Sequence, residues 1–97
     1  MMMKVIGLIK ILDQEAFEAY RSQVGQTVAI YGGSVKFRGE KKFMPWNELD
    51  CQDFDACVVI SFPTPDLAQR WAMSPEYAAL LSVRSKAMRL TLFGVIE

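Results

Sequence analysis

Histidine is absent from the 97 residues of the sequence, and its absence excludes several kinds of active site. A histidine-ligated haem, a Ser-His-Asp triad and a zinc or iron centre built on histidine all require that side chain. A glycine-rich phosphate loop and a dinucleotide-binding fingerprint are missing as well. We therefore expect no cofactor. We also expect no metal site, because the acidic cluster of Asp50, Asp53 and Asp55 does not have calcium-loop spacing.

The sequence also lacks net charge and long apolar runs. Eleven basic and eleven acidic residues cancel, so no basic stripe can neutralise phosphates and no nucleic-acid partner is expected. No run reaches the ~18 uncharged apolar residues that cross a bilayer, so no membrane partner is expected. Cys51 and Cys57 fit no zinc or redox spacing and are interpreted as reduced thiols. Because the apolar start also lacks a cleavage site, we predict a cytoplasmic protein.

Apolar residues, by contrast, make up 52% of the chain, slightly above the usual share. A chain of this length is expected to form one domain, residues 1–97, that is only marginally stable alone. Apolar periodicity and turn residues predict strands over 3–12, 34–39, 57–62 and 89–96. One helical region is expected between the first and second strands and another between the third and fourth. The second region should break and restart at Ser74-Pro75. This order of elements predicts an α+β fold.

Two of the expected elements have a clear amphipathic pattern. In the first helical region, which should begin after Asp13 and close at the Gly32-Gly33 pair, one apolar stripe comprises Phe17, Tyr20, Val24, Val28 and Tyr31. In the strand 34–39, Val35 and Phe37 are expected on one face, with Lys36 and Arg38 on the other.

The other three strands are apolar on both faces, which predicts a homodimer. In the first strand, for example, Val5 and Ile9 share one parity while Ile6 and Leu8 share the other. Two helices on one face of the sheet would leave an apolar patch bare on the other, and such patches usually mark a partner surface. Two copies packed face to face would bury both patches. Alternatively, the long aromatic loop 40–56 folds back over its own sheet.

Several short motifs together resemble a known family. They are Tyr31-Gly32-Gly33, Arg38-Gly39, Phe62-Pro63, Trp71, Ser74-Pro75-Glu76-Tyr77 and Arg84. This set resembles the domain-of-unknown-function 1330 family over nearly the whole chain. The resemblance implies a ferredoxin-like βαββαβ fold: a four-stranded antiparallel sheet with two helices on one face, assembled as a dimeric α+β barrel. The chain departs from the family at Glu40, where a second glycine often follows, and in its longer, more aromatic loop.

The wider superfamily implied by this resemblance includes cofactor-independent monooxygenases, haem-degrading enzymes, muconolactone isomerases and stress-response proteins. Fold alone does not choose among these activities, so whether the chain is an enzyme stays open. The first hypothesis is a site for a small apolar carboxylate or carbonyl compound, with aromatics for its body and arginine for its charge. The family pattern suggests as ligand-binding candidates Arg38, Trp71, Tyr77, Arg84 and Tyr31.

Each of these candidates also has a structural interpretation. Arg38 would be a solvated or ion-paired surface arginine, and Arg84 would pair with Glu76 or Asp66. Trp71 and Tyr77 would pack in the core, as most aromatic residues do, while Tyr31 would cap the helix end.

The second hypothesis is a non-catalytic protein-interaction or structural module that uses the loop 40–56. This loop holds Phe43, Met44, Trp46 and Phe54, which are side chains enriched at interfaces. Loops of this length without regular structure are uncommon and often functional. We therefore single out Trp46 and Phe43 as candidates for a lid or a partner contact.

Overall fold

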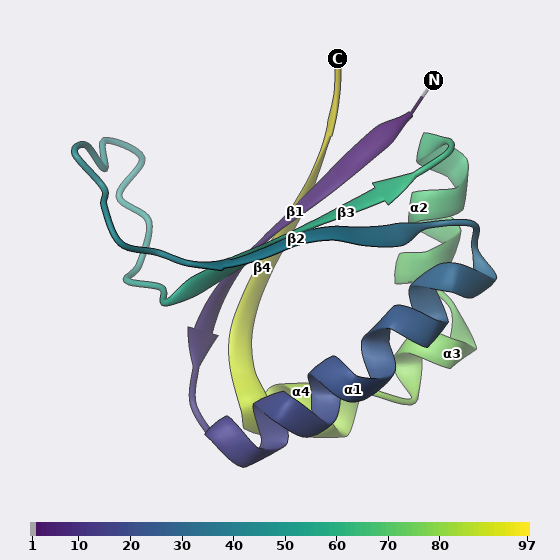
Figure 1. Ribbon diagram of the computed structural model, residues 1–97, viewed down its shortest axis with the longest axis horizontal. Helices are drawn as coiled ribbons and strands as arrows, with labels where there is room; N and C mark the ends of the chain where they lie inside the picture. The colour runs from purple at the N-terminus through teal and green to yellow at the C-terminus, as the bar shows by residue number, and fades with distance from the viewer. Residues whose placement is uncertain (1) are drawn as a thin grey trace.

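The computed structural model describes residues 2–97, which form a four-stranded antiparallel sheet covered by helices (Figure 1). The strands are β1 (Met3–Ile11), β2 (Ser34–Glu40), β3 (Ala56–Phe62) and β4 (Met88–Ile96). The helices are α1 (Gln14–Ile30), α2 (Pro65–Ala72), α3 (Pro75–Ala78) and α4 (Leu81–Ala87). The strand order across the sheet is β2-β3-β1-β4, and all helices lie on the same side (Figure 1). This arrangement confirms the predicted α+β class and order of elements.

Helix α1 begins and ends at the residues that the sequence indicates. The Asp13 side chain accepts a hydrogen bond from the Glu15 amide at 3.2 Å, which satisfies a free donor of the first turn. At the other end Gly32 adopts φ +78, and the Gly33 amide donates to the Val28 carbonyl at 3.1 Å. A left-handed residue at this position strongly favours glycine. The predicted apolar stripe is buried from Phe17 to Val28, while Tyr31 is half-buried.

The second helical region is divided into three short helices rather than two. The predicted restart is present: Ser74 caps α3 by accepting from the Tyr77 amide at 3.1 Å, with Pro75 in the first position. A further break separates α3 from α4 at Ala79 and Leu80, and α4 starts without a side-chain cap. Neither residue is a helix breaker, so no local signal marks that break.

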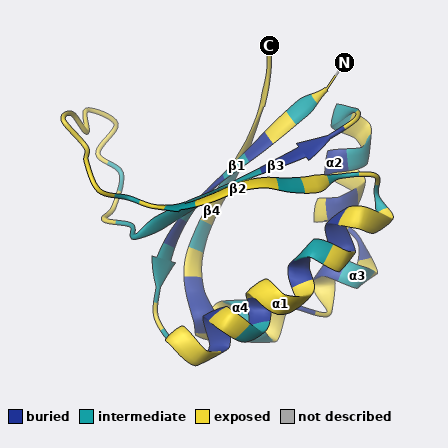
Figure 2. Cartoon of the chain, viewed as in Figure 1, coloured by how far each residue is buried: buried dark blue, intermediate teal, exposed yellow. Residues whose placement is uncertain are grey.

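The core lies between the helices and one face of the sheet. The sheet contributes alternate residues of its two central strands, as their pairing of Val5 with Ile60 and Met3 with Phe62 requires. The larger buried apolar side chains are Val5, Ile9, Ile60, Phe62 and Met88 from the strands, and Phe17, Tyr20, Val24, Val28, Trp71, Tyr77 and Leu80 from the helical side. Figure 2 shows this burial on the inner sides of the helices and central strands.

The edge strand β2 contains a bulge, so its side chains do not alternate as predicted. Its pairing with β3 shifts register between Val35 and Phe37, so Val35 pairs with Ile60 while Phe37 pairs with Val59. Phe37 therefore lies on the face opposite the helices, and Arg38 joins Val35 on the helix-covered face. The expectation that Val35 and Phe37 share a face was wrong, because the extra residue reverses the alternation.

The face of the sheet opposite the helices, here called the open face, carries an apolar row across all four strands. The row consists of Phe37, Val59, Ile6 and Phe93, which are successive cross-strand partners. Its outer members remain uncovered, since Phe37 is 56% and Phe93 45% exposed. No helix of the described residues is placed on this side (Figure 1).

The connection between β2 and β3 is a long loop, residues 41–55, that extends away from the helices (Figure 1). Its base is tied to the sheet: the Lys41 amide donates to Asp55, and the Asp55 amide donates to Ile9. Its tip is exposed, with Phe43 at 82%, Trp46 at 77% and Leu49 at 90% (Figure 2). The tip therefore does not fold back over the open face, contrary to the alternative raised above.

None of the helices formed by residues 2–97 is both long and apolar enough to traverse a lipid bilayer.

Candidate functional site

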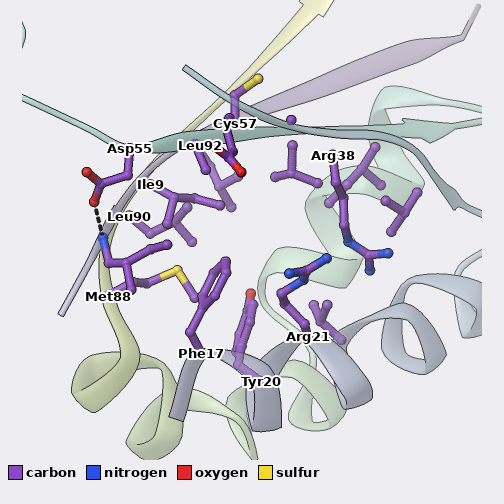
Figure 3. Close-up of a pocket in the computed structure, with 18 of the residues that line it drawn as sticks. Ile9, Phe17, Tyr20, Arg21, Arg38, Asp55, Cys57, Met88, Leu90 and Leu92 are labelled. Carbon is purple, nitrogen blue, oxygen red and sulfur yellow. Dashed lines mark hydrogen bonds between the residues drawn. The ribbon is translucent and has the colours of Figure 1, made fainter. Parts of the chain in front are cut away.

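A cavity of about 590 Å³ lies between α1 and the helix-covered face of the sheet. Apolar side chains from the central strands, β4 and the buried stripe of α1 form much of its wall; Figure 3 shows Ile9, Leu90, Leu92, Met88 and Phe17 directed into it. The polar residues Gln14, Glu40 and Asp55 also line it. The volume of this cavity lies within the range of small-molecule binding sites. Cys57 contributes its backbone, since its sulfur points away from the cavity (Figure 3).

Two arginines from different elements line one side of this cavity. Arg21 comes from α1 and Arg38 from the edge strand β2, and their guanidinium groups are directed toward each other (Figure 3). Both residues are exposed, which places them at the solvent side of the cavity. Arg21 contacts Glu18 at 3.2 Å, whereas no ion pair within residues 2–97 involves Arg38. Two like charges facing one another favour an anion between them.

The bulge in β2 is the reason why Arg38 reaches the cavity. In a regular strand, residues three positions apart lie on opposite faces. Without the extra residue, Arg38 would therefore lie opposite Val35 and point to the open face. Its guanidinium is free to bind a carboxylate in bidentate fashion, as the sequence hypothesis requires. The ligand-binding role itself stays a prediction.

Tyr77 and Arg84 are brought together, but one layer behind the cavity wall. The Arg84 Nη1 group donates to the Tyr77 hydroxyl at 3.0 Å, and that hydroxyl lies 2.8 Å from the hydroxyl of Tyr20. Tyr20 lines the cavity, whereas Tyr77 and Arg84 do not. The pairing of Arg84 with Glu76 or Asp66 considered above is not what the structure shows. Burial, followed by the neighbouring Tyr77, raises the pKa of Tyr20, so its phenol stays protonated.

Trp71 forms part of both the core and the cavity wall. It is 2% exposed, and its ring packs against Phe62 and Tyr77 with centroid distances of 5.5 and 4.7 Å. Its indole N–H donates to the Thr27 hydroxyl at 3.0 Å, which satisfies the only polar group of the ring. Trp71 therefore offers a ligand an aromatic surface and no free donor.

The remaining predicted site residues lie away from the cavity. Tyr31 donates to Glu76 at 2.8 Å, and this hydrogen bond raises the pKa of the Tyr31 phenol. It therefore links the end of α1 to α3. Trp46 and Phe43 occupy the exposed loop tip and do not line the cavity. Their lid or partner role stays a prediction.

Tyr20, Arg21 and Phe17 line the cavity, although the sequence hypothesis named none of these three as a ligand contact. Tyr20 and Phe17 belong to the predicted apolar stripe, and a stripe residue is normally assigned to the core. Arg21 follows Tyr20 directly and is held against Phe17, 5.4 Å from its ring centroid. The one available signal was an arginine at the border of that stripe, which is common on surface helices.

The acidic cluster around the loop base has a structural role. Asp53 lies 2.9 Å from Lys41 and 3.4 Å from Lys10, and hydrogen bonding to Lys41 lowers the pKa of its carboxyl. Asp55 accepts from the Ile11 amide at 2.8 Å (Figure 3). These contacts tie the loop base to β1. No group of three metal-ligating side chains occurs within residues 2–97.

Fold and cavity together define the class of protein: a ferredoxin-like α+β protein with a pocket between helix and sheet. The family model for the domain of unknown function DUF1330 matches residues 5–96, so the chain belongs to this family. This confirms the resemblance drawn from the sequence motifs. No curated protein matches the chain in sequence.

Solved structures share this fold at low sequence identity. A protein of unknown function from Rhodopseudomonas palustris, RPA0582, is 18% identical with a TM-score of 0.78, over 97% of this chain and 80% of its own. SnoaB, a cofactor-independent oxygenase from Streptomyces nogalater, is 8% identical with a TM-score of 0.72, over 99% and 92%. A dimeric ferredoxin-like protein of unknown function from Jannaschia sp. is 7% identical with a TM-score of 0.69, over both complete chains. These likenesses establish the ferredoxin-like fold.

Proposed function

We propose that the chain binds or converts a small apolar carboxylate or carbonyl compound without a cofactor. The observation that carries this proposal is the cavity of about 590 Å³, which combines apolar wall residues with two facing arginines, Arg21 and Arg38, and also has Gln14, Glu40 and Asp55 in its lining. An apolar body would replace water against the strand residues and Phe17, while the carboxylate would bridge the guanidinium groups. SnoaB, with the same fold, is a cofactor-independent oxygenase, which supports chemistry of this class.

Arginine substitutions test this binding mode. We expect Arg38→Ala and Arg21→Ala each to weaken the binding of phenylbutanoate, an aromatic monocarboxylate, by about tenfold, because a charge-assisted hydrogen bond is lost. Isothermal titration calorimetry would measure the dissociation constants.

Arg70→Ala is the matched control for these variants. Arg70 lies on α2, is bound to Asp66 at 3.0 Å and does not line the cavity, so phenylbutanoate affinity should not change. Failure of the wild-type protein to bind phenylbutanoate, or equal binding by all three variants, would refute the proposed site.

The proposed functional unit is a homodimer that buries the open face. The row of Phe37, Val59, Ile6 and Phe93 is apolar and crosses all four strands, so a second copy related by a twofold axis would cover it with an identical row. The Jannaschia protein and a ferredoxin-like protein from Bacteroides fragilis are described as dimeric, which supports this assembly. The cytoplasmic location stays a prediction from the sequence.

A second candidate function is a protein-interaction module built on the loop tip. Three large apolar side chains, Phe43, Trp46 and Leu49, are at least 77% exposed there. Aromatic side chains such as Phe43 and Trp46 are enriched at interfaces, and tryptophan is one of the residues that contribute most to binding energy there. The ion-paired loop base holds the tip away from the helices, as a protruding recognition element requires.

Fluorescence quenching distinguishes a free loop tip from a covered one. In a Trp71→Phe variant only Trp46 emits, and we expect acrylamide to quench it nearly as efficiently as free tryptophan because the ring is 77% exposed. The Trp46→Phe variant, which reports the 2% exposed Trp71, supplies the contrasting control. A shielded Trp46 in the isolated protein would contradict a freely available interaction loop.

A further inference from the structure

A hydrogen-bond chain runs from α4 through α3 to the cavity surface. Arg84 Nη1 donates to the Tyr77 hydroxyl at 3.0 Å, and the hydroxyls of Tyr77 and Tyr20 are 2.8 Å apart. Tyr77 is 3% exposed and Tyr20 is 7% exposed, so bulk water does not substitute for either partner. The two rings meet edge to face, at 87° and 6.4 Å between centroids. Packing therefore holds both hydroxyls in place.

Arginine gives this chain a direction. A guanidinium donates hydrogen bonds and cannot accept them, so the Tyr77 oxygen must be an acceptor toward Arg84. The proton of Tyr77 then needs an acceptor of its own, since a buried unsatisfied O–H group is costly. Within residues 2–97 the hydrogen bonds of this hydroxyl join it to Arg84 and Tyr20 alone. The two hydroxyls share one hydrogen bond, in which either oxygen can be the donor. The charged donor on the Tyr77 oxygen favours donation from Tyr77 to Tyr20, because this order satisfies the deeper proton and leaves the proton of Tyr20 beside the cavity.

This direction leaves the proton of Tyr20 without a protein acceptor. The Tyr20 oxygen is occupied as the acceptor of Tyr77, and no other hydrogen bond of Tyr20 exists within the described chain. Figure 3 shows the hydroxyl end of Tyr20 directed into the cavity, between Phe17 and Arg21. A phenol that already accepts one hydrogen bond is also a better donor in the other direction.

We infer that Tyr20 is a ligand-contacting residue that donates a hydrogen bond to a carbonyl or enolate oxygen of the bound compound. Tyr77 and Arg84 are positioning residues that fix the direction of that donor. This inference rests on the proposed function and narrows its ligand class. The ligand carries two separate features: a carboxylate for Arg21 and Arg38, and a carbonyl-type acceptor for Tyr20.

The same geometry indicates what the site can do chemically. A hydrogen-bond donor fixed at a carbonyl oxygen stabilises negative charge that develops there. Because burial raises the pKa of Tyr20, the residue keeps its proton and acts as a donor rather than as a base. The arrangement therefore suits the stabilisation of an enolate or another oxyanion.

A matched pair of probes tests this inference in the wild-type protein. Benzoylpropanoate has an aromatic ring, a ketone and a carboxylate; in phenylbutanoate a methylene replaces the ketone. We expect benzoylpropanoate to bind about fivefold more tightly, as one net hydrogen bond would produce. Equal affinities would overturn the role of Tyr20 while leaving the arginine site intact. Absence of binding by both probes would instead refute the proposed function itself.

Three variants assign the donor. Tyr20→Phe keeps the ring, and we expect it to abolish the fivefold preference for benzoylpropanoate without changing phenylbutanoate affinity by more than about twofold. Arg84→Met should reduce the preference as well, because Tyr77 without the charged donor on its oxygen no longer favours donation toward Tyr20; a merely structural role would weaken both probes equally. Tyr31→Phe, whose hydroxyl binds Glu76 outside the cavity, should behave as wild type. A preference that survives in Tyr20→Phe would overturn the inference.

Discussion

Replacing Phe93 with glutamate is expected to convert the protein from a dimer to a monomer. Phe93 lies at one end of the apolar row of the open face, next to Ile6, and is 45% exposed in the single chain. In a face-to-face dimer its ring would be buried against the second sheet. A carboxylate in that position would lose its hydration without gaining a partner, at a cost of several kcal/mol. Sedimentation equilibrium at micromolar concentration would measure the shift from twice 11.0 kDa to 11.0 kDa.

Leu49→Glu provides the matched control for this substitution. Leu49 is a comparably large apolar residue that is 90% exposed, but it belongs to the loop tip and not to the open face. The dimer should therefore persist in this variant. Dissociation caused by Leu49→Glu, and not by Phe93→Glu, would show that the loop forms the subunit contact. An 11.0 kDa species in the wild-type protein would contradict the dimer altogether.

Trp71→Ala is expected to lower the free energy of unfolding by about 3–5 kcal/mol. The indole is almost completely buried, packs against Phe62 and Tyr77, and donates a hydrogen bond to Thr27. Its removal leaves a void beside the cavity and a hydroxyl without its donor. Urea unfolding followed by circular dichroism would measure the loss, at one fixed protein concentration because a dimer unfolds in a concentration-dependent way.

Trp46→Ala is the internal comparison, since the two tryptophans differ chiefly in burial. Trp46 is 77% exposed, and surface substitutions usually change the unfolding free energy by about 0.5 kcal/mol or less. Equal losses in both variants would mean that the loop tip packs against the protein in solution. A small loss in Trp71→Ala would mean that the core closes over the missing ring.

The stability and ligand experiments address the same structural element. Trp71, Tyr77 and Tyr20 form a continuous aromatic layer between the core and the cavity. Substitutions that remove a ring of this layer change both the fold and the site, so their effects on binding are not specific. Tyr20→Phe and Arg84→Met avoid this difficulty because they keep all three rings and change only polar groups.

The order of elements, the family and several helix boundaries could be predicted from sequence because their causes are local. Asp13 caps α1 through the amide two residues further on, and Gly32 takes a backbone angle that favours glycine. The Ser74-Pro75 restart depends on contacts within four residues. Apolar side chains occur at both odd and even positions of β1, and this pattern can be read without knowing the partner strands. It indicates that both faces of the strand are covered.

The composition of the cavity could not be predicted in the same way. Arg38 reaches it only because β2 bulges where it pairs with β3, and a bulge depends on the register between two strands that are distant in sequence. Tyr20 and Arg21 looked like core and surface residues of an ordinary amphipathic helix until the sheet opposite them was in place. Tyr77 and Arg84 lie on separate short helices, α3 and α4, and are joined by a hydrogen bond; their distance from the cavity is set by α1, which inserts Tyr20 in front of them.

By itself, the sequence determined which segments become strands and helices, and that one face of the sheet would be left apolar, since these properties follow from local periodicity and capping. Only the tertiary structure decided which side of β2 each residue occupies and which hydroxyl meets the cavity. The physical reason is that strand register and the stacking of side chains from different elements depend on long-range packing, which no local pattern encodes.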